Sequence, residues 1–264
     1  MEIEEKIIRI PKMFGNGAHV FVPKNWIGEQ VILVKQPKKD FKARIIQVLE
    51  PHLENILGAY LYGSYARSEQ NEYSDIDLFI ISNKKIIIKE KGFEIISLEE
   101  KNIENALKIE PLLIYLILSE AKPIINSKLL EELKNKYHPK LSDFNEFFRL
   151  TKEMIKVNLE FLNLEKGDYI LGSAVIYSLV LRLRGIYFIR SLLKAEQHSN
   201  KSFKNWVRKE LPRIDFNKIY DSYIFAKNDK KTNLKILVKD LRILMDFLKE
   251  QISILENDKK GKEA

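Results

Sequence analysis

YLYGSYAR (residues 60–67) and SDIDLFI (residues 74–80) decide the fold of this 264-residue chain. In the first stretch an apolar strand ends at Gly63, where the absence of a β-carbon lets the backbone pass close to a bound group. Ser64 is expected to open a helix, so that its hydroxyl and the first free backbone N–H groups point outward together. Such a helix start is a favourable place for the phosphates of a nucleotide.

The second stretch carries two carboxylates, Asp75 and Asp77, at the start of an expected strand. Their spacing places both side chains on one face of the sheet. Adjacent carboxylates repel each other unless a cation neutralises them, and Mg²⁺ is a natural counter-charge. Gly-Ser and Asp-x-Asp are each common alone. Together, and in this order along the chain, they favour metal-assisted phosphoryl or nucleotidyl transfer.

The order of strand, Gly-Ser, short helix, Ser-Asp-x-Asp and strand resembles the DNA polymerase β-like nucleotidyltransferase superfamily. The chain looks closest to the minimal and kanamycin-type nucleotidyltransferases of prokaryotes, and the resemblance covers residues 41–139. It implies that Asp75 and Asp77 bind Mg²⁺ (or Mn²⁺) together with an NTP. The nucleotide-binding residues that we expect within this domain are Gly63, Ser64, Arg67 and Ser74.

In that superfamily a third carboxylate comes from a later strand, and Glu94 in Gly92-Phe93-Glu94-Ile95-Ile96 has the matching context. The resemblance therefore implies that Glu94 helps to hold the metal and draws the proton from the acceptor hydroxyl. Asp is usual at this position, and Glu is one methylene longer. Two readings stay open: a repositioned base, or a site that binds nucleotide and turns over poorly. Glu90 is the alternative third acid.

The domain around these motifs is predicted to be α+β, with a small mixed sheet. Apolar residues recur at helical intervals over 41–57, and strands are expected at 59–62, 77–81 and 93–96. Helices follow at 99–108, 111–119 and 127–136, and residues 123–125 are a candidate edge strand.

From residue 140 to 256 the pattern is almost entirely helical, which predicts a helical bundle, and residues 257–264 form an expected tail. The helices are expected over 143–164, 168–195, 201–209, 215–226 and 232–255. This segment resembles the C-terminal bundle that follows many nucleotidyltransferase domains and forms the second wall of their cleft.

The chain is basic, with a net charge of +8, and residues 182–213 hold nine basic residues against two acidic ones. Four of the side chains in this region lie within about 120° of one another on a helix that is otherwise apolar. They are Arg184, Tyr187, Arg190 and Lys194. Cations on a buried helix need partners. They either pair with acids of the bundle or face the triphosphate across the cleft, and the sequence leaves both readings open.

Residues 1–36 are β-rich, with strands expected at 8–10, 19–22 and 31–34, and they resemble the swapped-hairpin DNA-binding modules of AbrB or SpoVT type. About 36 residues cannot bury a stable core alone, so this segment needs a partner. We expect a homodimer through this module, with DNA as a possible ligand. The alternative is a hairpin that packs on the sheet of its own chain.

Composition excludes several classes of site. The chain has no cysteine and its four histidines are far apart, which removes thiolate metal sites and cysteine nucleophiles. No apolar run is long enough for a membrane span, and the acidic N-terminus is unlike a secretory signal, so we expect a cytoplasmic protein.

The sequence thus predicts a Mg²⁺-dependent nucleotidyltransferase that moves an NMP from an NTP to an acceptor hydroxyl on an RNA end, a protein or a small molecule. The alternative is a dimeric DNA-binding and nucleotide-sensing regulator, or an antitoxin, with weak or no catalysis.

Overall fold

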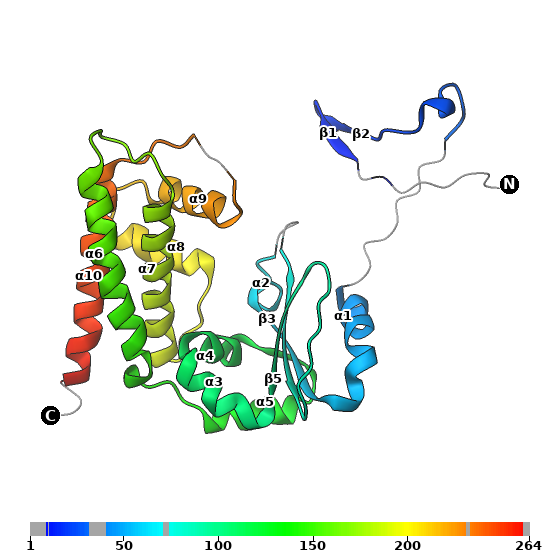
Figure 1. Cartoon of the computed structure of the whole chain (residues 1–264), viewed down its shortest axis with the longest axis horizontal. Helices are drawn as coiled ribbons and strands as arrows, with labels where there is room; N and C mark the ends of the chain where they lie inside the picture. Colours follow the sequence, from blue (N-terminus) through cyan, green and yellow to red (C-terminus); the bar gives the residue numbers. More distant parts are fainter. Residues whose placement is uncertain (1–8, 10, 32–40, 71–73, 231–232, 261–264) are drawn as a thin grey trace. The chain divides into compact units, whose positions relative to one another are not determined.

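The computed structural model describes residues 9, 11–31, 41–70, 74–230 and 233–260, the last three without their side chains (Figure 1). The chain divides into two compact units, Met1–Ala43 and Arg44–Ala264. No helix in these described ranges is both long enough and apolar enough to cross a membrane.

The first unit contains a short antiparallel hairpin of β1 (Lys12–Phe14) and β2 (Gly17–His19), followed by a 3₁₀ turn, η1 (Lys24–Trp26). The chain reverses at Gly15, which has a positive φ of 54°. The expected strand at 19–22 is wrong beyond His19. The rest of the predicted β pattern, at residues 8, 10 and 32–34, lies outside the described residues.

A four-stranded mixed sheet forms the centre of the second unit. The strands are β3 (Ile56–Tyr62), β4 (Ile76–Ser82), β5 (Phe93–Glu99) and β6 (Lys122–Ile125), in the order β5-β4-β3-β6. β3 is antiparallel to β4 and β6, whereas β4 and β5 are parallel. The register sets Tyr62 opposite Asp77, and Asp77 opposite Glu94. The expected α+β fold with a small mixed sheet is confirmed.

The helix expected at 41–57 is too long. α1 (Phe41–Leu49) ends before Pro51, and the chain continues as a 3₁₀ helix, η2 (Glu50–Asn55). Proline has no backbone N–H and its ring clashes with the preceding turn, so it breaks a regular α-helix. Ile56 and Leu57, which fit the helical period, belong to β3 instead.

The remaining helices of the sheet region are short, and they lead into a helical bundle (Figure 1). The short ones are α2 (Gly63–Ala66), η3 (Glu100–Asn102), α3 (Ile103–Ile109), α4 (Pro111–Glu120), α5 (Ser127–Lys136) and η4 (Leu141–Phe144). The bundle consists of α6 (Asn145–Leu164), α7 (Ala174–Leu193), α8 (Asn200–Glu210), α9 (Phe216–Lys227) and α10 (Val238–Lys260).

α7 is the central helix, as its nearly uniform apolarity predicts. It packs against α4, α6, α9 and α10. It begins at Ala174, six residues later than expected, because residues 168–173 form an irregular segment in which Tyr169 pairs with Leu237 in a β-bridge. One continuous apolar core runs from Tyr60 and Phe79 of the sheet to Leu183 of α7. The sheet region and the bundle therefore fold as one unit, and α4 joins them.

Candidate active site

The turn after β3 is shaped by the closeness of Gly63 to Asp77. Gly63 has a φ of +69°, and a β-carbon at this position would lie 1.8 Å from Oδ2 of Asp77. A side chain would thus meet both an unfavourable backbone conformation and an overlap with a carboxylate. Only glycine fits, and the Asp77 carboxylate lies directly against the backbone of the turn.

Asp77 and Glu94 lie side by side, because they are partners in the parallel register of β4 and β5. Asp77 is half-buried and Glu94 is exposed. Burial, and next the charge of Glu94, raise the pKa of Asp77 to about 6. The backbone N–H of Ser64 and the Arg67 guanidinium act in the opposite direction. The neighbouring positive charge is too small to offset the repulsion between these two carboxylates, and a bound divalent cation would remove that repulsion.

Asp75 immediately precedes β4 and is exposed. In the described part of the chain no three Asp, Glu or His side chains come close enough together to hold a metal ion. Asp77 and Glu94 are adjacent and suit Mg²⁺, which prefers oxygen ligands. The set of three carboxylates, Asp75, Asp77 and Glu94, stays a prediction.

The start of α2 differs from the expected row of free N–H groups. The N–H of Gly63 donates to Oε1 of Glu120 at 2.7 Å, and that of Ser64 donates to the Asp77 carboxylate. α2 has only four residues, so its dipole is small. What Ser64 can offer a phosphate is its hydroxyl, which has no hydrogen-bond partner among the described residues. Ser74 lies next to Asp75 and is partly buried.

Arg67 lies between two carboxylates. Its Nε donates to Glu69 at 3.0 Å and its Nη1 donates to Glu120 at 2.5 Å. Its side chain is 20% exposed. Any contact of Arg67 with a phosphate would therefore have to compete with two ion pairs that already exist.

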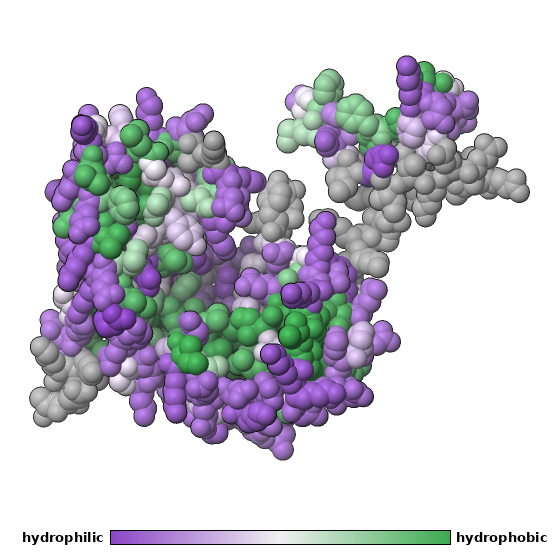
Figure 2. All heavy atoms as spheres, viewed as in Figure 1, coloured by the Kyte–Doolittle hydropathy of each residue, from purple (hydrophilic) through white to green (hydrophobic). Residues whose placement is uncertain are grey.

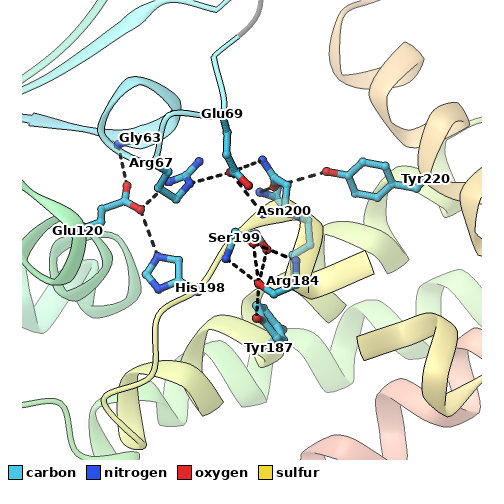
Figure 3. Close-up of polar contacts among 11 residues, drawn as sticks. Gly63, Arg67, Glu69, Glu120, Arg184, Tyr187, His198, Ser199, Asn200 and Tyr220 are labelled. Atoms are coloured by element: carbon cyan, nitrogen blue, oxygen red, sulfur yellow. Dashed lines mark hydrogen bonds and ion pairs between the residues drawn. The ribbon is translucent and has the colours of Figure 1, made fainter. Parts of the chain in front are cut away.

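Glu120 and His198 belong to this site, although the sequence did not indicate either (Figure 3). Glu120 ends α4, and its carboxylate is 3.2 Å from Nε2 of His198, in the loop before α8. The two side chains are 10% and 5% exposed. They are separated by 78 residues in the chain. A lone acid and a lone histidine so far apart carry no local signal, so only the fold could reveal the pair.

Arg184 reaches the same network from α7 (Figure 3). Its Nη1 donates to the Tyr223 hydroxyl at 2.8 Å, and its Nη2 donates to Oδ1 of Asn200 at 3.0 Å. Its guanidinium also lies 5.2 Å from the ring centroid of Phe188. Nε is buried without a partner. No described acid forms an ion pair with Arg184, so its charge is not compensated.

The other three residues of the predicted basic face have different contacts from those of Arg184. Arg190 donates to Gln251 of α10 and lies 5.1 Å from the ring of Trp206. Tyr187 donates to Ser202 at 2.8 Å. Both residues, with the exposed Lys194, line a separate cavity of about 160 Å³. The structure therefore does not gather the four residues into one clamp, since α7 turns Arg184 and Arg190 towards different neighbours.

Comparison with known proteins bears on the same region. A model of the family described as Polymerase beta, Nucleotidyltransferase matches residues 43–137. A protein of Methanocaldococcus jannaschii that is named as a protein adenylyltransferase is 30% identical over 97 residues, which are 37% of this chain and 88% of that protein. The chain belongs to the polymerase β nucleotidyltransferase family. It is a nucleotidyltransferase enzyme, as the Gly-Ser and Asp-x-Asp motifs predicted.

The family match of this nucleotidyltransferase runs from α1 to the end of α5, so it includes the Gly63 turn, Asp77 and Glu94. A solved spectinomycin adenyltransferase of Enterococcus faecalis, with ATP and spectinomycin bound, covers 80% of this chain and 97% of its own. Its sequence identity is 14% and its TM-score is 0.45.

Proposed function

We propose that this nucleotidyltransferase moves a nucleoside monophosphate, AMP first among them, from an NTP to a hydroxyl of a protein side chain. The hydroxyl oxygen bonds to the α-phosphorus, the bond between the α- and β-phosphates breaks, and pyrophosphate leaves. The observation that carries the proposal is the pairing of Asp77 with Glu94 directly beside the Gly63 turn. This pair is a site for a divalent cation next to a turn that can receive a nucleotide. The name of the M. jannaschii relative supports AMP as the group and protein as the acceptor.

Asp77, Glu94 and Asp75 would hold Mg²⁺ or Mn²⁺, which supplies charge neutralisation to the triphosphate when bound. Glu94 is the exposed member of the Asp77–Glu94 pair, and it takes the proton from the acceptor hydroxyl. Asp77 is fixed by the Ser64 N–H and by its packing on Gly63, so its role is to hold the cation in one place.

The triphosphate is bound by the Ser64 hydroxyl from one side and by Arg184 from the other. Arg184 is the member of the basic face that suits this role, because it contacts only neutral hydrogen-bond partners and its Nε has none. A half-buried guanidinium without a carboxylate gains most from an anionic ligand.

The proposal is tested by incubating the protein with α-labelled ATP, GTP, CTP or UTP, Mg²⁺ and either cell lysate or total tRNA. Label from ATP should appear on protein and be lost with Asp77→Asn. Label on tRNA alone would make an RNA end the acceptor. No label on any macromolecule or small molecule, with NTP binding retained, would favour the nucleotide-sensing regulator instead.

A second proposal concerns the N-terminal unit, which we expect to pair with a second copy of the chain. No described residue of this unit is buried, and several of its large apolar side chains are exposed to solvent (Figure 2). Met13, Phe14, Phe21 and Ile27 are each at least 70% exposed. A hairpin with these side chains on its surface gains much by association. Such a dimer is the form in which a module of this type would contact DNA.

A further inference from the structure

Glu120 holds three parts of the molecule at once. Its Oε1 accepts the Gly63 N–H at 2.7 Å, and its Oε2 accepts from Arg67 at 2.5 Å and lies 3.2 Å from His198. Burial alone would raise the pKa of Glu120, but these three partners together lower it. An ionised carboxylate that is 10% exposed and fully engaged is rigid.

A second chain of contacts continues from Arg67 into the helical bundle (Figure 3). Arg67 donates to Glu69, and Oε2 of Glu69 accepts from the backbone N–H and the side-chain amide of Asn200, each at 3.4 Å. Oδ1 of Asn200 in turn accepts from Arg184. An unbroken series of polar contacts thus joins the Gly63 turn to Arg184, the proposed phosphate-binding cation.

This arrangement is costly for a site that binds a triphosphate. A negative charge next to the Gly63 turn repels a polyanionic ligand, and Arg67, which could attract one, is occupied by Glu69 and Glu120. The presence of Glu120 at this position therefore cannot be explained by a gain in affinity for the triphosphate. The reason that the contacts offer is geometric: Glu120 fixes the amide of the residue whose α-carbon lies against the Asp77 carboxylate.

We infer that Glu120 is a positioning residue for nucleotidyl transfer. It fixes the Gly63 turn, and through Arg67, Glu69 and Asn200 it sets the position of Arg184 relative to that turn. The inference rests on the proposed function. It assigns no contact between Glu120 and the substrate, so Glu120 acts on the transfer through the positions of the Gly63 turn and of Arg184.

Replacement of Glu120 should therefore separate kcat from KM. Glu120→Gln keeps an oxygen for the Gly63 N–H but loses the ion pair with Arg67, and Glu120→Ala loses both. We expect kcat to fall about tenfold in the first variant and about a hundredfold in the second, as misplacement of reacting groups does. The KM for ATP should stay within about threefold of the wild type, because a repulsive charge is removed and Arg67 is released.

The experiment measures kcat, the KM for ATP, the melting temperature and the exchange rate of the Gly63 amide in the full-length protein. Glu160→Gln is the matched control, because Glu160 is an exposed acid of α6 without an ion pair among the described residues. The Gly63 amide should be protected in the wild type and in Glu120→Gln, and exposed in Glu120→Ala. If both variants keep the wild-type kcat, or if only KM rises, the inference is wrong. A wild type without transfer activity would instead overturn the proposed function.

Discussion

Gly63 and Asp77 are packed so closely that residue 63 can have no side chain. The added β-carbon would be 1.8 Å from Oδ2 of Asp77, and the φ of +69° is one that side-chain-bearing residues rarely adopt. The same contact places the carboxylate against the turn, where the backbone N–H of Ser64 donates to it. The active site is therefore built on a backbone constraint, and the glycine of the Gly-Ser motif is required by Asp77.

Gly63→Ala should destabilise the protein and abolish transfer. The strained φ alone costs about 1–3 kcal/mol, and displacement of the Asp77 carboxylate adds to this cost. We expect a melting temperature lower by several degrees and no detectable transfer by the folded protein. Gly167→Ala is the control, because nothing lies within 4 Å of its added β-carbon. Equal effects of the two substitutions would contradict the packing argument.

The carboxylate pair predicts how stability depends on pH without metal. Because the pKa of Asp77 is raised to about 6, the folded state binds its proton more tightly than the unfolded state does. The contribution of this group to the free energy of unfolding therefore increases as the pH falls through 6 towards the ordinary pKa of an aspartate. Above pH 6 the ionised carboxylate destabilises the folded state. Asp77→Asn removes that cost.

In EDTA, Asp77→Asn should raise the melting temperature by a few degrees at about pH 7.5 and change it little at about pH 4.5. Mg²⁺ should raise the melting temperature of the wild type at the higher pH and leave that of Asp77→Asn unchanged. Thermal melts at the two pH values provide the check. A variant that is less stable than the wild type at both would show that the pair is not under electrostatic strain.

The divided basic face predicts unequal roles for two arginines of α7. Arg184→Gln should weaken ATP binding about tenfold or more, because charged hydrogen bonds contribute about 1.5–3 kcal/mol each. Arg190→Gln is the matched substitution six residues further along α7, and we expect the affinity for ATP to stay within about threefold of the wild type. Calorimetry with Mg²⁺ and ATP measures both. Equal losses would restore the single clamp of four residues that the helical period suggested.

Particular residues show how much of the fold and of the site could be predicted from the sequence. The strands around Gly63 and Asp77 follow from local patterns and from the order of the motifs. Glu94 was expected at the site from the family resemblance, and its place opposite Asp77 comes from the register of β4 and β5. Pro51 ended a helix that the apolar period had extended to residue 57. Here the local backbone chemistry of proline overrides the apolar periodicity.

What the sequence could not give are contacts between distant segments. Glu120 accepts a hydrogen bond from the Gly63 N–H, 57 residues away in the sequence, and contacts His198, 78 residues away. No periodicity or motif connects these residues. The same is true of the different directions of Arg184 and Arg190, which depend on where α9 and α10 pack. The amides at the start of α2 were expected to be free, but they donate hydrogen bonds to Glu120 and Asp77, which come from other segments of the chain.

Removal of the N-terminal unit tests the proposed dimer. Full-length protein should sediment as a dimer at micromolar concentration, whereas a variant without residues 1–40 should be a monomer that still binds ATP. Phe14→Ser with Ile27→Ser should have the same effect without deletion, because both side chains are over 70% exposed in the single chain. A full-length monomer would rule the association out.

The most direct test of the account is to measure nucleotide binding and transfer together for Asp77→Asn and Glu94→Gln. With Asp77→Asn, Mg²⁺-dependent ATP binding by calorimetry should be lost, because the residue that fixes the cation is gone. With Glu94→Gln, ATP binding should persist while label transfer falls at least a hundredfold, because the base is gone. If both variants bind ATP and transfer label as the wild type does, the carboxylates beside the Gly63 turn are not the active site.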